Sequence, residues 1–214
     1  MGRTKSSKIA ELASLVNVIQ GEYDIKGRWS EMHFGNANPI VAELGCGRGD
    51  YTVELAKRFP AINFIGIDLK GARLWRGAKN ALASNLINVV FLRTAIRKLE
   101  EYFAADEISE IWLTFPDPYP KRRHESLRLT SPRFLNLYRK ILKPDGAIHL
   151  KTDDPDLFDY TIKAVKADGW RIREAFDDIY GKPVNNEIIY IQTKYEKQHL
   201  ADGKKIRYMK FIPQ

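Results

Sequence analysis

Short apolar runs alternate with amphipathic stretches along most of the chain after residue 39. The apolar runs are continuous, which is typical of strands buried on both faces of a parallel sheet. The stretches between them carry apolar residues three and four positions apart, which predicts helices. We therefore expect strands at 40–44, 62–67, 89–92, 108–115, 147–151, 170–176, 188–192 and 206–212, and helices at 51–59, 72–84, 132–141 and 157–166.

This alternation predicts an α/β fold in which helices cover both faces of a mostly parallel central sheet, a three-layer sandwich. In such folds ligands bind beyond the carboxyl ends of the strands, near the point where the strand order reverses. The residues that follow each expected strand are therefore the first place to look for chemistry.

The beginning of the chain follows a different pattern. Four apolar residues at helical spacing predict a helix there: Leu12, Leu15, Val16 and Ile19. We expect residues 1–35 to form a flexible basic arm and helix, and residues 36–214 to form a single domain. The basic residues of the arm make it a candidate contact for RNA, through Arg3, Lys5 and Lys8.

Composition limits the class of protein. A chain of 214 residues is long enough for one domain with its own core. Lysine and arginine outnumber aspartate and glutamate by 35 to 27, and the net charge of +8 favours a polyanionic partner such as nucleic acid. The single cysteine, Cys46, excludes a disulfide framework and a cysteine-cluster metal site, and we predict no metal. Since the chain has no long apolar run and no secretion signal pattern, we expect a cytoplasmic protein without a membrane partner.

A glycine-rich turn, Gly45-Cys46-Gly47-Arg48-Gly49, follows the expected strand 40–44. Glycines allow a sharp turn and a close approach of a ligand to the backbone. A dinucleotide-binding turn has the pattern G-x-G-x-x-G, but Asp50 stands in place of its last glycine. Asp50 and the preceding Glu43 repel a pyrophosphate and favour a ligand with positive charge, such as S-adenosylmethionine. NAD, or a turn without a ligand, stays open as an alternative.

Two further strand ends carry candidate cofactor residues. Asp68 lies 21 residues after Gly47, where a carboxylate accepts hydrogen bonds from the hydroxyl groups of a ribose. NAD and S-adenosylmethionine both contain that ribose, so Asp68 does not separate them. Thr94 and Ala95 follow the strand 89–92, beside the expected place of an adenine ring, and an ordinary surface turn is the alternative for them.

The strand 108–115 leads into a loop with three prolines at alternate positions, 116, 118 and 120. Prolines stiffen a loop, so this one can hold Asp117 and Tyr119 in fixed directions. Tyr119 offers an aromatic face on which a base can stack. Four cations follow that can contact phosphate groups: Lys121, Arg122, Arg123 and Arg128. A solvated run of charges is the alternative interpretation.

Four motifs in this order resemble those of the bacterial tRNA (guanine-N7)-methyltransferases. They are Glu43-Leu44-Gly45-Cys46-Gly47 with Asp68, the loop from Pro116 to His124, Lys151-Thr152-Asp153, and Thr193-Lys194-Tyr195-Glu196. The resemblance implies a class I methyltransferase fold of Rossmann-like type, S-adenosylmethionine as cofactor, and tRNA as partner. It also implies that the methyl group goes to N7 of the guanosine at position 46 in the tRNA variable loop. The chain departs from the family pattern at Asp68, where glutamate is usual, at Tyr119, where tryptophan is usual, and at 94–95, where an acid is frequent.

The resemblance also implies a role for each matching residue. It implies that Asp117 is catalytic. Binding of the cofactor is implied for Glu43, Gly45, Gly47, Asp68, Thr94, Ala95 and Asp117. Binding of the substrate is implied for Lys121, Asp153, Thr193, Lys194, Tyr195 and Glu196. Contact with RNA is implied for Arg123, His124 and Arg128.

The chemistry of the target is compatible with this assignment. N7 of guanine has a free lone pair, so its methylation needs no base, and catalysis depends on positioning and electrostatics. The carboxylate of Asp117 can accept hydrogen bonds from guanine N1–H and the exocyclic amine, and its charge can stabilise the cationic product. Adenine lacks this pair of donors, so it would leave the carboxylate unpaired. Because the target base is engaged in tertiary pairing in folded tRNA, we expect it to be extruded into the pocket.

Several alternatives stay open. Asp153 can be the N-cap of the helix after it, although Asp154 or Asp156 can serve as well. The basic residues near the C-terminus can extend an RNA surface or protect an edge strand from pairing: Lys204, Lys205, Arg207 and Lys210. Another RNA guanosine, an NAD-linked oxidoreductase and a non-catalytic RNA-binding protein are the competing functions. The sequence leaves monomer and homodimer both open.

Overall fold

The computed structural model describes residues 4–181, 184 and 186–214. In this part of the chain eight strands form one sheet in the order β1-β4-β3-β2-β5-β6-β8-β7. All neighbours pair in parallel except β8, which is antiparallel to both β6 and β7. The strands are β1 (Val18–Gln20), β2 (Ile40–Leu44), β3 (Asn63–Ile67), β4 (Val89–Arg93), β5 (Ile108–Thr114), β6 (Leu142–Thr152), β7 (Arg171–Phe176) and β8 (Arg207–Ile212).

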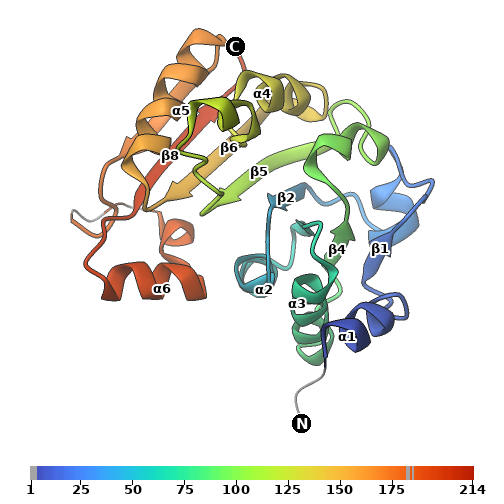
Figure 1. The fold of residues 1–214 in the computed structure, drawn as a ribbon. Helices are drawn as coiled ribbons and strands as arrows, with labels where there is room; N and C mark the ends of the chain where they lie inside the picture. Colours follow the sequence, from blue (N-terminus) through green and yellow to red (C-terminus); the bar gives the residue numbers. More distant parts are fainter. Residues whose placement is uncertain (1–3, 182–183, 185) are drawn as a thin grey trace.

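Helices cover both faces of the sheet, so the predicted three-layer α/β sandwich is confirmed (Figure 1). One face carries α4 (Pro132–Arg139) and α5 (Pro155–Ala167). The other carries α1 (Lys5–Leu12), α2 (Asp50–Arg58), α3 (Gly71–Ala83) and α6 (Lys194–Ala201). Short helical turns lie at η1 (Ser30–Phe34), η2 (Ile96–Glu101), η3 (Arg122–Leu127) and η4 (Glu187–Tyr190).

A separate apolar core fills each side of the sheet. Leu135 and Tyr138 of α4 and Val165 of α5 pack into the first core. Leu55 of α2 and Leu74 of α3 pack into the second. Strands β2 and β3 are buried at every position, which explains why their sequences read as continuous apolar runs.

The segment before β2 packs against the sheet. Strand β1 pairs in parallel with β4, and α1 lies against α3. Trp29 is fully buried in the first core and donates a hydrogen bond from its indole N–H to the Tyr102 carbonyl, at 2.8 Å. Lys5 is exposed and the Lys8 ammonium lies over the Trp75 ring, whereas Arg3 of the predicted RNA-binding arm lies outside the described residues.

The helix predicted from Leu12, Leu15, Val16 and Ile19 is wrong. Helix α1 ends at Leu12, Val16 is 82% exposed, and Ile19 lies in strand β1. Pairing along the edge of β4 gives Val18–Gln20 backbone partners that a longer helix would not use. Four apolar residues at helical spacing do not distinguish a helix from the end of a helix followed by a turn and a strand.

The strand predicted at 188–192 is also wrong. The helical turn η4 occupies its first part, and Ile189 and Ile191 fill the second core. Side chains satisfy its carbonyl groups in place of a neighbouring strand: the Tyr51 hydroxyl donates to the Ile188 carbonyl at 3.0 Å, and the Lys151 ammonium donates to the Ile191 carbonyl at 3.0 Å.

Strand β8 is not at the edge of the sheet, because β6 and β7 flank it. The alternative that its basic residues protect an edge strand is therefore wrong. Two of them form ion pairs with Asp177 across the sheet end: Lys205 at 3.7 Å and Arg207 at 2.8 Å.

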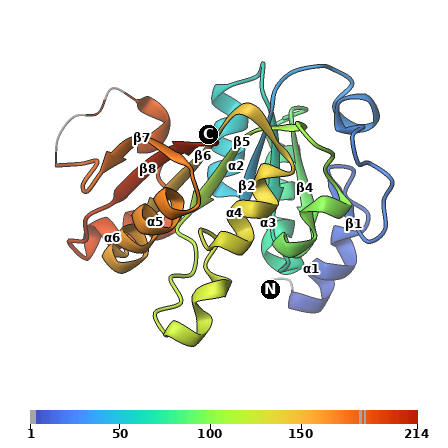
Figure 2. The same cartoon turned by 90° about the horizontal axis from the view of Figure 1, so that it is seen from above.

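The strand order reverses at β2. The chain proceeds from β2 outward to β3 and β4, and then returns to the other side of β2 with β5 and β6. Ligands of such sheets bind in the crevice at this point, beyond the carboxyl ends of the strands. The segment after β5 projects from the body of the molecule beside that edge, in yellow-green (Figure 2). Among the described residues no helix has the length and apolar character needed to cross a membrane.

Candidate active site

A cavity of about 730 Å³ lies beyond the carboxyl ends of β2, β3, β4 and β5. It brings together most of the residues that the sequence singled out. Ten of the residues with a role implied by the family resemblance line it: Glu43, Gly45, Gly47, Asp68, Thr94, Ala95, Asp117, Asp153, Thr193 and Tyr195. The glycine turn and the proline loop are therefore two walls of one cavity.

The glycine turn forms the first wall. The backbone N–H groups of Gly45 and Cys46 both donate to the Ile67 carbonyl, at 2.8 and 3.0 Å, which fixes the turn at the end of β3. Gly45 has φ of 75° and Gly47 has φ of 57°, a left-handed conformation that favours glycine. A Cβ added to Gly45 would have no atom within 4 Å. A Cβ added to Gly47 would have only the Gly45 carbonyl oxygen nearby, at 3.9 Å. Hence these two glycines leave room for a ligand at the cavity wall.

Gly49 has a different role in the same turn. A Cβ added there would lie 2.5 Å from the Phe91 ring. Gly66 and Gly77 surround the same ring, since a Cβ on either would approach it to 2.7 Å. Gly49 therefore serves packing of α2 against the sheet.

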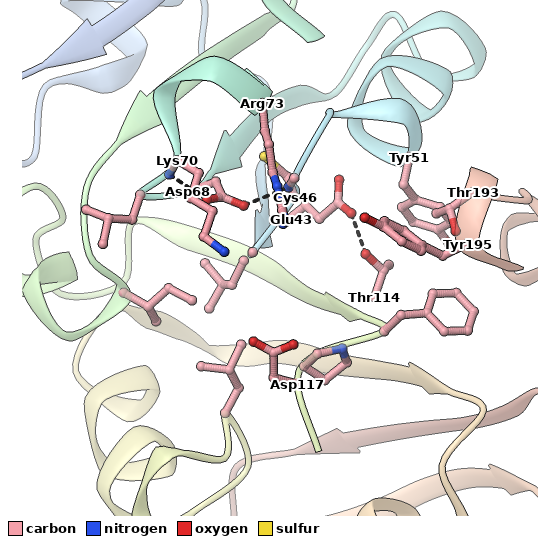
Figure 3. A pocket seen from close by; sticks show the side chains of 18 of the residues that line it. Glu43, Cys46, Tyr51, Asp68, Lys70, Arg73, Thr114, Asp117, Thr193 and Tyr195 are labelled. Atoms are coloured by element: carbon pink, nitrogen blue, oxygen red, sulfur yellow. Dashed lines mark hydrogen bonds between the residues drawn. The ribbon is translucent and has the colours of Figure 1, made fainter. Parts of the chain in front are cut away.

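Asp68 connects the end of β3 to the glycine turn. Its Oδ2 accepts from the Gly47 N–H at 2.9 Å, and its Oδ1 accepts from the Lys70 N–H at 2.7 Å. Figure 3 shows the carboxylate at the cavity wall, next to the turn. Each carboxylate oxygen has a second lone pair, so Asp68 retains the capacity to accept from a ribose hydroxyl.

Glu43 is almost completely buried at the base of the cavity. Its carboxylate accepts from the Thr52 N–H at 2.9 Å and from the hydroxyl groups of Thr52 and Thr114. Burial raises the pKa of Glu43 to about 7, although these hydrogen bonds oppose the shift. The side chain thus joins β2, α2 and β5 beneath the ligand space.

The proline loop forms the opposite wall. Figure 3 shows Asp117 across the cavity from Glu43 and Asp68. Its side chain is exposed to the cavity, and no hydrogen bond or ion pair to it occurs within the described part of the chain. Phe115 with φ of 50° and Tyr119 with φ of 45° are in the left-handed region, which is unfavourable for non-glycine residues. The loop is therefore held in a strained conformation with a free carboxylate between the two strained positions.

Arg128 holds this loop. Its Nε donates to the Pro118 carbonyl at 3.0 Å, and its Nη2 donates to the Tyr119 carbonyl at 3.1 Å. The guanidinium also stacks 4.2 Å from the centre of the Tyr160 ring. The family resemblance implies a contact between Arg128 and RNA; in the structure two of its three guanidinium nitrogens donate to this loop.

A third wall comes from the end of β6. Asp153 forms an ion pair with Lys204 at 2.6 Å and lies 3.5 Å from Nδ1 of His199. Asp153 does not cap the following helix, because Asp154 accepts from the Leu157 N–H at 2.7 Å. Of the open alternatives for the cap, the structure selects Asp154.

Helix α6 closes the same side of the cavity. Thr193 is its N-cap and accepts from the Glu196 N–H at 3.1 Å. Tyr195 lies at the rim and is 53% exposed. Glu196 points away from the cavity into the protein, where it pairs with Lys151 at 2.8 Å.

The remaining candidates lie outside the cavity. Lys121 precedes η3, and Arg123 and His124 lie on that turn; the Lys121 and Arg123 side chains are exposed. Lys194 is exposed at the start of α6. Lys121, Arg123 and Lys194 are therefore accessible to a large ligand from solvent.

The cavity wall also contains residues that the sequence motifs did not indicate, among them Tyr51, Thr114 and His199. Tyr51 and Thr114 stand next to the quoted motifs, at the first turn of α2 and the last position of β5. His199 lies one turn after Tyr195 on α6, and it could be placed in the site only once a helix was predicted there. Thr193-x-x-Glu196 has the spacing of a helix capping box, so the sequence did contain a signal for the start of this helix.

Comparison with known proteins identifies the family. Residues 37–209 match a family model described as "Putative methyltransferase". The chain is 53% identical over 190 residues to the tRNA (guanine-N(7)-)-methyltransferase of Porphyromonas gingivalis, covering 88% of this chain and 77% of that one. The chain belongs to this methyltransferase family. A second member, the tRNA (guanine-N(7)-)-methyltransferase of Christiangramia forsetii, is 47% identical and the alignment covers 98% of this chain and 97% of the relative.

Solved structures show that the fold is that of class I methyltransferases. The 16S rRNA methyltransferase KamB superposes with a TM-score of 0.66 at 14% identity, covering 86% of this chain and 92% of that one. A variant of the 16S rRNA (adenine(1408)-N(1))-methyltransferase from Catenulisporales acidiphilia, crystallised with its cosubstrate SAM, gives a TM-score of 0.61 at 14% identity, covering 100% and 92% of the chains. The fold and family inferred from the sequence motifs are thus confirmed.

Proposed function

We propose that this protein transfers a methyl group from S-adenosylmethionine to N7 of a guanosine in tRNA, at position 46 in the variable loop. The observation that carries the proposal is the free Asp117 carboxylate, which faces the glycine turn across one cavity. The relatives at 53% and 47% identity carry the name of this activity.

The residues of the first wall fit the cofactor. Gly45 and Gly47 present open backbone where a Cβ would fill the space, and Asp68 has lone pairs for the ribose. When bound, S-adenosylmethionine supplies a methyl group on a positively charged sulfur. The carboxylate of Asp68 lies against the glycine turn, so this part of the cavity favours the positive charge of S-adenosylmethionine over the pyrophosphate of NAD.

Asp117 selects and orients the base in this mechanism. Its carboxylate accepts from guanine N1–H and the exocyclic amine, which directs N7 toward the first wall. No proton has to be removed, because N7 attacks with its own lone pair. The negative charge of Asp117 then stabilises the positive charge that develops on the ring.

The surroundings of the opening fit a tRNA. Tyr119 and Tyr195 offer aromatic faces at the cavity rim, and each can stack on a base. Exposed cations beside the proline loop can contact phosphate groups: Lys121, Arg122 and Arg123. Because Asp117 faces a cavity, the target base has to leave its stack to reach it.

Transfer of tritium from methyl-labelled S-adenosylmethionine to tRNA tests the proposal. A tRNA transcript with guanosine at position 46 should be labelled, and a transcript with adenosine there should not. In Asp117→Ala we expect kcat/KM to fall by about a hundredfold or more, because the base loses both its anchor and its charge stabilisation. The Kd of S-adenosylmethionine should stay within about threefold, since the glycine turn is intact; a larger rise would support the cofactor contact that the family resemblance implies for Asp117.

The exposed Asp145, at the opposite end of β6, provides the matched control as Asp145→Ala, which should retain wild-type turnover. Labelling of both transcripts would assign the activity to another RNA guanosine. Full turnover by Asp117→Ala would contradict the proposed role of this carboxylate.

A further inference from the structure

The most deeply buried ion pair of the described chain lies directly behind the cavity wall. Lys151 of β6 and Glu196 of α6 are 2.8 Å apart, and both side chains are 0% exposed. The same ammonium donates to the Ile191 carbonyl at 3.0 Å, and the other carboxylate oxygen of Glu196 accepts from the Tyr180 hydroxyl at 2.9 Å. The two Lys151 contacts attach the connection between β7 and β8 to the central sheet, and the Tyr180 contact lies within that connection.

This pair is one layer away from the ligand space. The Lys151 ammonium lies 5.3 Å from the centre of the Tyr51 ring and 5.9 Å from that of Phe115, and both rings line the cavity. Glu196 lies in the first turn of α6, next to Thr193 and Tyr195. Thr193 and Tyr195 line the cavity, and Glu196 does not. Neither Lys151 nor Glu196 lines the cavity, but both lie next to residues that do.

The position of α6, in the connection between β7 and β8, depends on directional contacts with the rest of the protein. Helix α6 has eight residues, which is too short to be stable without tertiary contacts. Apolar contacts of Ile189 and Ile191 hold the segment to the sheet, but they are not directional and permit several placements. An ion pair with two further hydrogen bonds accepts one placement, because any other leaves a buried charge without a partner.

We propose that Lys151 and Glu196 are positioning residues, which fix α6 so that Thr193, Tyr195 and His199 face the substrate nucleoside. This inference rests on the proposed function. Under it, Glu196 acts on tRNA through the placement of its neighbours on α6 and not by contact with RNA. The role differs from the substrate contact that the sequence motif implied for Glu196.

Paired substitutions distinguish positioning from contact. In Glu196→Gln the Lys151 ammonium has no counterion. In Lys151→Met the Glu196 carboxylate has no counterion. We expect either change to raise the KM for tRNA by about tenfold or more and to leave the KM for S-adenosylmethionine within about threefold. The double variant Lys151→Met, Glu196→Gln removes both charges and keeps side chains of similar size. It should recover about fivefold or more of the KM lost in Glu196→Gln.

A direct contact between Glu196 and tRNA gives the opposite pattern. The double variant would then be impaired as strongly as Glu196→Gln, and Lys151→Met would retain the wild-type KM for tRNA. Either result overturns the inference. Val165→Ala in α5 is the control for lost stability, because it removes buried volume from the other face of the sheet. It should lower Tm and leave both KM values unchanged.

Hydrogen exchange supplies a readout that does not depend on activity. Backbone amides at 194–201 should exchange about tenfold faster or more in each single variant and return toward the wild-type rate in the double variant. Unchanged exchange there in the single variants would overturn the positioning role. If the wild-type protein transfers no methyl group to tRNA, the proposed function fails, while the exchange rates still decide whether the pair holds α6.

Discussion

The carboxylate of Asp68 accepts a hydrogen bond from the backbone N–H of Gly47 at 2.9 Å, across 21 residues of sequence. A second hydrogen bond, from the Lys70 N–H at 2.7 Å, ties the same carboxylate to the start of α3. The residue expected to bind the ribose therefore also shapes the turn that would hold the rest of the cofactor. Loss of this side chain should affect both contacts together.

Asp68→Ala should raise the Kd of S-adenosylmethionine by about tenfold or more, because hydrogen bonds to a charged group contribute about 1.5–3 kcal/mol each. Binding of tRNA without the cofactor should change little, since the proline loop and η3 lie on the opposite wall. Isothermal titration calorimetry with each ligand measures the two effects. An unchanged Kd for the cofactor would show that Asp68 has only a structural role.

Two glycines of the turn should respond differently to the same substitution. In Gly47→Ala the Cβ enters open space, so the cost is left-handed strain of roughly 1–2 kcal/mol together with lost room for the ligand. In Gly49→Ala the Cβ would also lie 2.5 Å from the Phe91 ring, so the free energy of unfolding should fall further. Urea denaturation and cofactor titration of both variants separate these effects. Equal losses of stability would contradict the assignment.

The sequence predicts the central part of the fold because local pattern and tertiary structure agree there. Strands β2 and β3 are buried at every position and β4 and β5 at most of theirs, and the helices between them have one apolar face, so periodicity is sufficient. The errors at 12–19 and 188–192 have a different origin. At both places partners distant in sequence decide the backbone: β4 for Val18–Gln20, and the side chains of Tyr51 and Lys151 for 188–191.

The candidate site was predictable where its residues follow strands. Parallel strands end at one edge, so the glycine turn, Asp68 and Asp117 meet there whatever the details of packing. The contacts that Arg128 and Glu196 make within the protein were not predictable in this way. A charged residue in a motif can face a ligand or the protein, and only the structure shows that Arg128 donates to the Tyr119 carbonyl and that Glu196 pairs with Lys151.

Arg128 should influence turnover through the conformation of the proline loop. Arg128→Met removes the donors to the Pro118 and Tyr119 carbonyls, so the strained loop should relax and move Asp117. We expect kcat to fall by about tenfold or more, with the Kd of S-adenosylmethionine within about threefold. Single-turnover kinetics at saturating tRNA measure this effect.

Arg123→Met provides the contrast for Arg128. Arg123 is exposed on η3 and makes no contact with the backbone of the proline loop within the described residues. Its loss should raise the KM for tRNA and reduce the slope of log K against log salt by about 1, as expected for one lost phosphate contact. If Arg128→Met gave this same salt signature with an unchanged kcat, Arg128 would be an RNA contact.

The raised pKa of Glu43 makes the free energy of unfolding depend on pH. Its pKa is raised from 4.5 to about 7 because the side chain is buried beneath the cavity. Between these two pH values the folded protein retains a proton that the unfolded chain has released. The contribution of Glu43 to the free energy of unfolding therefore decreases as the pH rises from about 4.5 to 7. Above pH 7 this contribution no longer changes with pH.

Glu43→Gln should remove this dependence, because an amide does not titrate. Between pH 5 and pH 8 the difference in unfolding free energy between variant and wild type should shift by about 2–3 kcal/mol in favour of the variant. Urea denaturation at the two pH values gives this difference, and other titrating groups cancel from it. Glu22→Gln serves as control, because it makes the same chemical change at an exposed position and leaves Glu43 in place. Parallel profiles for Glu43→Gln and wild type would mean that Glu43 is ionised in the folded protein across this range, with its charge stabilised by the surrounding hydrogen bonds.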